Sequence, residues 1–169
     1  MIFDKPKLKP TSNSNTKFED LCEQFKEAKE KSPEAFEHLI LETAAECKQA
    51  IAREFSVMIP NYEIILCNNE MFDKLYAEEP QRGRKPSAFT NRLKGIIVIN
   101  VEAALTTWGT FTVAIVLDES EEFVHAAFPF ANEIDAKRKS HTITEKFLQI
   151  ELPEEWKKAA LQNAVSPDY

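Results

Sequence analysis

Hydrophobic residues recur every three or four positions in two segments of the N-terminal half, which is the spacing of an amphipathic helix. A capping box of Thr16 and Glu19 precedes the first stripe and predicts a helix that ends near Lys31. Ser32 and Pro33 suit an N-cap and a first helical position, so they begin a second, longer helix. Its apolar stripe comprises Phe36, Leu39, Ile40, Ala44, Cys47, Ile51 and Phe55.

From residue 62 the pattern becomes typical of strands. The run YEIIL (62–66) is rich in β-formers, and Asn68 with Asn69 is a turn signal, so we expect a hairpin packed on the two helices. Further strands are expected at 96–101, 110–117 and 123–130, with the polar run DESEE (118–122) as the hairpin turn between the last two. Residues 131–142 predict a loop, 143–152 an edge strand, and 154–164 a short terminal helix.

Together these elements predict the α+β class, with two N-terminal amphipathic helices packed on a small, mostly antiparallel β-sheet and a short C-terminal helix. A length of 169 residues fits one domain or two very small ones. We expect a flexible lead-in at 1–16, a helix–helix–strand unit at 17–80, a basic linker at 81–94 and a β-rich unit at 95–169. This last unit is either separate or continuous with residues 17–80.

Composition removes several classes of function. The three glycines, Gly83, Gly95 and Gly109, are too few and too far apart for a dinucleotide fingerprint or a P-loop. Three distant cysteines indicate a reducing compartment and argue against a disulfide framework or a zinc knuckle. The first ten residues lack the apolar core of a signal peptide, and no apolar run approaches the roughly 20 residues of a membrane span. We therefore expect a cytoplasmic protein without a membrane partner, a cofactor or a metal.

Positive charge is concentrated in residues 81–94, which contain five basic side chains and no acid. These are Arg82, Arg84, Lys85, Arg92 and Lys94. Their +5 leaves −12 for the remainder of a chain whose net charge is −7. The run RGRKP is similar to an AT-hook, but a pI of about 5.1 opposes general nucleic-acid binding. We expect this basic patch to dock on an acidic partner or on the protein's own acidic helices.

Several short runs between residues 20 and 80 follow one another in a characteristic order. These are Ala28 and Phe36, Leu39 to Leu41, AIAREF (50–55), Ile59 with Pro60, YEIIL (62–66), and Leu75 with Tyr76 leading to Pro80. The pattern resembles the nitrile-hydratase-like leader family, whose members are folded leader domains on precursors of ribosomally made, modified peptides. The resemblance implies a leader-type binding fold whose partner is a peptide-modifying maturation enzyme.

Two features separate this chain from the activities of that family. Nitrile hydratases carry a cysteine-rich metal loop beyond the hydrophobic strand, whereas residues 75–81 contain no cysteine, so iron or cobalt ligation and nitrile hydration are excluded. The chain also lacks the Gly-Gly step that a precursor presents to its protease. Ser56 replaces the glycine that usually follows the second helix in the family. The resemblance therefore favours a binding protein over a precursor.

No residue pattern marks a catalytic or metal site. His38, His125 and His141 fall in different predicted elements, without a histidine or cysteine at ligand spacing. Cys67 or Ser120 could form a nucleophile–base pair with His125 only if the fold brought them together. The acids of the DESEE run are expected to be solvated charge at a hairpin tip: Asp118, Glu119, Glu121 and Glu122.

The leading hypothesis is a non-catalytic protein-binding module that pairs strand 62–66 with a strand of its partner. The expected contact or support residues are Tyr62, Ile64, Leu66, Tyr76, Phe36 and Phe55. Two alternatives stay open. One is a small hydrolase-type enzyme, which requires Cys67 or a carboxylate within hydrogen-bond reach of His125. The other is an inhibitor or immunity-type protein that acts through its acidic surface.

Overall fold

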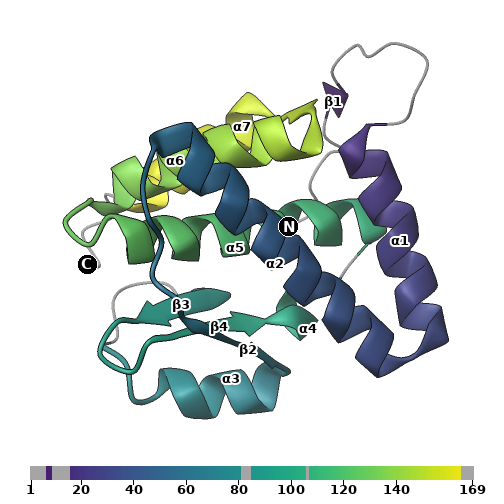
Figure 1. The fold of residues 1–169 in the computed structure, drawn as a ribbon, viewed down its shortest axis with the longest axis horizontal. Coiled ribbons are helices and arrows are strands. Elements are labelled where there is room, and N and C mark those ends of the chain that lie inside the picture. The colour runs from purple at the N-terminus through teal and green to yellow at the C-terminus, as the bar shows by residue number, and fades with distance from the viewer. Residues whose placement is uncertain (1–6, 9–15, 81–84, 106, 165–169) are drawn as a thin grey trace.

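Helix α5 (Trp108–Ala127) runs through the middle of the molecule, between a group of helices and a small sheet (Figure 1). The computed structural model describes residues 7–8, 16–80, 85–105 and 107–164 of the chain. The other elements are β1 (Lys7–Leu8), α1 (Lys17–Lys31), α2 (Pro33–Phe55), β2 (Glu63–Cys67), α3 (Asn69–Tyr76), β3 (Ala88–Asn91), β4 (Ile96–Asn100), α4 (Val101–Ala104), α6 (Glu133–Leu148), β5 (Ile150–Glu151) and α7 (Glu154–Ala164).

The N-terminal helices begin where their capping residues predict. The Thr16 hydroxyl accepts a hydrogen bond from the Glu19 backbone N–H at 3.2 Å, and the Glu19 carboxylate accepts one from the Thr16 N–H at 3.3 Å. Ser32 caps α2 by accepting from the Ala35 N–H at 3.0 Å. Ser56 ends α2 with φ 52° and ψ 49°, the left-handed conformation usually given to glycine. The helix therefore closes in the usual geometry without that glycine.

The sheet has three strands in the order β2-β4-β3 and is mixed. Strand β2 runs parallel to β4, with Glu63 opposite Ile96, and β3 runs antiparallel to β4, with Ala88 opposite Ile99. Successive β4 residues face opposite layers, because Ile97 belongs to the main core and Val98 to a smaller cluster under α3. Figure 1 shows α3 below the sheet and α5 above it. The α+β class is confirmed.

Two of the predicted strands are wrong, because residues 110–117 and 123–127 belong to the single helix α5, DESEE lies inside it, and residues 128–130 follow it without forming a strand. Thr107 caps this helix by accepting a hydrogen bond from the Thr110 N–H at 3.1 Å. Helices α1, α2 and α6 and the sheet all pack against α5. The first half of α5 is apolar on nearly every side and shows no 3.6-residue period, so residues 110–117 resemble a two-sided strand.

Three further expectations are corrected by capping residues. Asn68 does not turn a hairpin but caps α3, accepting from the Met71 N–H at 2.9 Å. Asn132 caps α6 by accepting from the Asp135 N–H at 2.8 Å, so the expected loop at 131–142 and most of the expected strand at 143–152 are helical. Only Ile150–Glu151 forms a strand there, paired with β1. The strands expected at 62–66 and 96–101 and the terminal helix are confirmed.

The two predicted units share one core and one sheet. Strand β2 comes from residues 17–80 and β4 from residues 95–169, yet they are hydrogen-bonded neighbours. Within the stretch expected to be a linker, residues 88–91 form β3, and Ala88 and Phe89 are buried. Three aromatic rings join α1, α2 and α5, because Phe111 lies 5.1 Å from Phe25 and 5.3 Å from Phe36. Among the described residues, no helix is long and apolar enough to cross a bilayer.

The Phe111 ring should be a main source of stability. We expect Phe111→Ala to lower the free energy of unfolding by about 3–5 kcal/mol, because it leaves a cavity between three helices. Phe130 is 100% exposed, so Phe130→Ala should change stability by less than about 0.5 kcal/mol. Urea unfolding followed by circular dichroism measures both. Similar losses in the two variants would contradict the central position of α5.

Candidate functional site

One face of the buried helix α5 carries ionisable side chains. Asp118, Glu121, Glu122 and His125 stand at positions i, i+3, i+4 and i+7, so the helical period gathers them on one side. Glu133, the first residue of α6, approaches the same face across the connection between the two helices. The expected solvated hairpin tip is thus a largely buried polar face between α6 and β3.

His125 is held between two carboxylates. Its Nε2 atom lies 3.2 Å from Glu133 Oε1 and 3.8 Å from Glu121 Oε1. The Lys137 ammonium of α6 donates to Glu121 at 3.0 Å. The side chains of His125 and Glu121 are only 15% and 19% exposed, so water screens these contacts weakly. We call Glu121, His125 and Glu133 the His125 cluster.

The charges within the His125 cluster stabilise one another. Burial alone would lower the pKa of His125, but its contacts with Glu121 and Glu133 raise the pKa to about 10. Burial alone would raise the pKa of Glu121, but His125 and Lys137 lower it to about 2. At neutral pH the imidazolium, the ammonium and the Glu121 carboxylate are therefore all charged.

Two neighbouring carboxyls behave in the opposite way. Burial, with the Glu121 charge beside it, raises the pKa of Glu122 to about 8, and burial raises that of Asp118 to about 7. Both accept hydrogen bonds from the β3 side of the sheet. The Thr90 hydroxyl donates to Glu122 at 2.8 Å, and the Ser87 hydroxyl donates to Asp118 at 2.9 Å. Acids with such different proton affinities on one helix face occur both in functional sites and in structural ion-pair networks.

Another acid of α5 lies in the core. Glu119 is 1% exposed, and neither of its carboxylate oxygens has a hydrogen-bond partner among the described residues. Burial and the neighbouring Asp118 raise its pKa well above the usual range. Burial, reinforced by Glu119, also raises the pKa of the Cys47 thiol, which favours the inert thiol over the reactive thiolate. Neither Cys67 nor Ser120 is among the described groups that contact His125.

Three aromatic residues expected to line pockets or to support the core, Phe36, Phe55 and Tyr76, contact other aromatic rings of the protein. Phe36 is buried, the Phe55 ring lies 5.9 Å from that of Phe128, and Tyr76 stacks on Phe72 at 5.9 Å. They support the core and the sheet. The expected strand residues Tyr62, Ile64 and Leu66 lie on or beside β2 and are half-buried, as Phe55 and Tyr76 are.

The described residues of the basic patch contact the protein itself. The Lys85 ammonium pairs with Asp73 of α3, and the Lys94 ammonium lies 3.1 Å from Glu78. The Arg92 guanidinium donates to the backbone carbonyl of His125 at 2.8 Å. Arg82 and Arg84 lie outside the described residues. These contacts fasten the segment around β3 to α3 and to the C-terminal end of α5.

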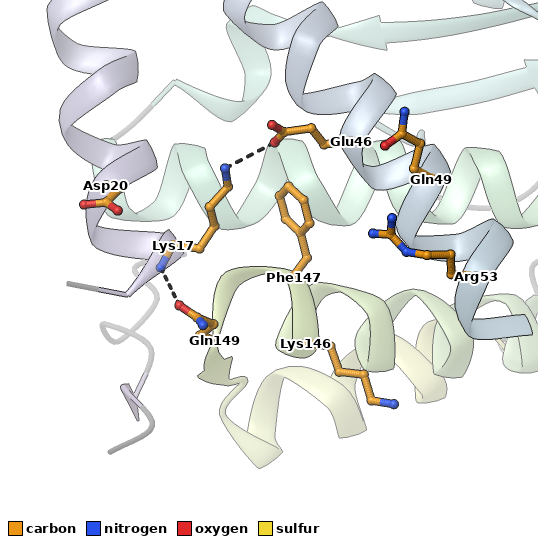
Figure 2. A pocket seen from close by; sticks show the side chains of 8 residues that line it. All are labelled: Lys17, Asp20, Glu46, Gln49, Arg53, Lys146, Phe147 and Gln149. Carbon is orange, nitrogen blue, oxygen red and sulfur yellow. Dashed lines mark hydrogen bonds and ion pairs between the residues drawn. The ribbon is translucent and has the colours of Figure 1, made fainter. Parts of the chain in front are cut away.

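A polar pocket of about 510 Å³ lies between α1, α2 and α6 (Figure 2). The Lys17 ammonium crosses it to Glu46 at 3.2 Å, and the Lys17 backbone N–H donates to Gln149 at 2.9 Å. Figure 2 shows the Phe147 ring in its centre, with the Arg53 side chain on the α2 wall. The lining mixes both signs of charge and includes no residue of the His125 cluster.

Sequence reasoning missed the His125 cluster because it assigned Glu121 to a turn and His125 to a strand. The necessary signal was present in the spacing of the acids. In a helix, residues 118, 121, 122 and 125 share one face. In a strand, residues 118 and 122 would lie on one face and residues 121 and 125 on the other. Glu133 gave no local signal, because its approach depends on how α6 folds back on α5.

Comparisons with protein-family models, with curated proteins and with solved structures find no match for this chain. The resemblance of residues 20–80 to the leader family therefore stays a prediction. Proposals about function rest on the geometry of this chain.

Protonation of Glu122 should make folding stability depend on pH. Its folded pKa lies above the ordinary value of 4.5, so its favourable contribution is complete below that value and is lost as pH rises towards about 8. The loss is at most about 1.4 kcal/mol per pH unit. We expect Glu122→Gln, which can still accept the Thr90 hydrogen bond, to lose less stability than the parent between about pH 5 and about pH 8.

Guanidinium unfolding at the two pH values measures this difference. The exposed Glu155→Gln variant removes one carboxylate without touching the α5 face, so it should keep the parent's pH dependence. Equal losses of stability in the parent and in Glu122→Gln would contradict an uncharged Glu122.

Proposed function

We propose that this protein is a non-catalytic binding module whose partner adds a β-strand to the open edge of β2. The observation that carries the proposal is the position of β2 in the sheet. Strand β4 pairs with one side of β2, and no described element pairs with the other side. Unpaired backbone groups on an edge strand are a ready template for another strand.

The backbone register identifies the groups that a partner would meet. The Glu63 N–H donates to the Gly95 carbonyl at 2.9 Å, so Glu63 faces β4. Residues alternate along a strand, and Ile65 and Cys67 therefore face β4 as well. The backbone N–H and C=O groups of Ile64 and Leu66 point outwards. They provide two donors and two acceptors for an added strand.

The surroundings hold this edge in a fixed conformation. Ile64 and Leu66 pack against the main core, and Ile65 packs against the smaller cluster beneath α3. A strand that is covered on both faces is already ordered, so binding of a partner costs it little conformational entropy. The exposed Glu63 side chain adds charge at the rim, where charge influences selectivity. The leader-like pattern suggests that the partner is a peptide-modifying enzyme.

The contacts of His125 favour a second candidate, a small hydrolase-type enzyme. The 3.2 Å contact with Glu133 places a carboxylate within reach of the imidazole and keeps it protonated at neutral pH, so His125 would act as a general acid and not as a base. Turnover of chromogenic ester, amide or phosphate substrates by the parent but not by His125→Gln would support it. Equal turnover by the two proteins would reject a role for His125.

The strand-addition proposal is tested at Ile64. Both Ile64→Ala and Ile64→Pro remove side-chain packing, but only proline removes the outward N–H group. We expect Ile64→Ala to bind within a few-fold of the parent's affinity. Ile64→Pro should bind at least about tenfold more weakly than Ile64→Ala. Binding is measured by calorimetry with purified peptide-modifying enzymes that recognise folded leader domains.

Circular dichroism and thermal unfolding establish that both variants fold. Amide hydrogen exchange gives a second readout, because the Ile64 and Leu66 amides should become protected only in the complex. Absence of binding by the parent, or equal affinities of the two folded variants, would contradict strand addition at β2.

A further inference from the structure

We propose that Glu121, His125 and Glu133 form a binding site for a divalent transition-metal ion such as Zn²⁺. One carboxylate oxygen from each glutamate and one imidazole nitrogen lie within 4.8 Å of one another. Two ligands come from successive turns of α5, and the third comes from the start of α6. Two separate elements therefore direct their side chains to one point.

The distances match the span of a metal coordination sphere. Ligand atoms of a tetrahedral zinc ion lie at about 2.0–2.2 Å from the metal, and so at about 3.3–3.6 Å from one another. His125 Nε2 lies 3.2 Å from Glu133 and 3.8 Å from Glu121, on either side of that range. The third distance, between the two carboxylate oxygens, is within 4.8 Å, so side-chain movements of up to about 1 Å would bring the three ligand atoms to the tetrahedral spacing.

The donor set selects the class of metal. An imidazole nitrogen suits zinc and the neighbouring transition metals, whereas calcium and magnesium favour all-oxygen sites. Three protein ligands leave a fourth position for water or for a carboxylate. Glu122 is adjacent to Glu121 in the chain and lies on the same face of α5. The site therefore fits an ion with three protein ligands and one exchangeable position.

The cluster already holds cations at the point where the ion would sit. His125 Nε2 lies 3.2 Å from Glu133, and the Lys137 ammonium donates to Glu121 at 3.0 Å. The same carboxylate oxygens would bind a divalent ion, which concentrates two positive charges at one point. Glu119 takes no part in the site, because it lies in the core, where it raises the pKa of Cys47 of α2.

Metal binding would rearrange the contacts of the free cluster. The ion takes the place of the proton on His125 Nε2, and that proton passes to solvent. Lys137 now donates to Glu121, but its side chain is 21% exposed and can turn towards water. The proposal does not depend on strand addition, because β2 contributes no ligand, so either proposal can fail without the other.

Calorimetry with ZnCl₂ on the chelator-treated full chain tests the site. We expect one ion per chain with a Kd of about 10 µM or tighter. His125→Gln and Glu133→Gln should each weaken binding at least about tenfold. The Glu133 side chain is 43% exposed, so its variant keeps the test usable if His125→Gln does not fold. The parent's Co²⁺ complex should show the visible absorption of a four-coordinate ion.

A matched control comes from α2. His38 and Glu42 also form an i,i+4 pair, with His38 Nε2 2.8 Å from the carboxylate, but they belong to no described three-ligand cluster. His38→Gln should leave zinc affinity unchanged. Three outcomes would overturn the proposal: no zinc binding by the parent, unchanged affinity in both folded cluster variants, or affinity lost in His38→Gln.

Discussion

The burial of α5 is the constraint on which the rest of this structure depends. Its first half supplies apolar side chains, and Phe111 joins the aromatic rings of α1 and α2. Its second half carries acids whose burial is costly unless they are paired or uncharged. Ser87 and Thr90 provide partners from the β3 side and Lys137 from α6, whereas burial keeps Glu119, which has no partner among the described residues, uncharged. The positions of β3 and α6 are therefore coupled to the charges of one helix.

That coupling explains why the acids of one helix differ so much in proton affinity. Glu121 faces two cations and has a pKa of about 2, whereas Glu122, the next residue, meets a neutral hydroxyl and has a pKa of about 8. A low-dielectric environment amplifies the attraction of each charged pair and the cost of each unpaired charge. The arrangement allows α5 to carry Glu121 and His125 as a charged pair while its buried neighbours remain largely neutral.

Sequence reasoning succeeded where a short local signal decides the structure. The caps at Thr16 and Ser32 and the β-rich runs that became β2 and β4 each act within a few residues, and the structure confirms them. It failed at α5, because the first half of this helix is apolar on nearly every side and resembles a two-sided strand. The His125 cluster was then missed, because residues 118–122 were assigned to a turn although their spacing fits one face of a helix. Its residues are neighbours only if α5 is a helix, and Glu133 joins them only through the packing of α6.

The sheet separates the two proposed binding features. Strand β4 occupies the middle of the sheet, the open side of β2 forms one edge, and β3, which touches the acid face of α5, forms the other. A partner strand added to β2 would therefore lie on the opposite edge from the hydroxyl contacts to Asp118 and Glu122. Strand addition uses backbone groups that are already in place, and metal binding uses side chains of α5 and α6. Because the two share no residue, one chain can accommodate both without competition between them.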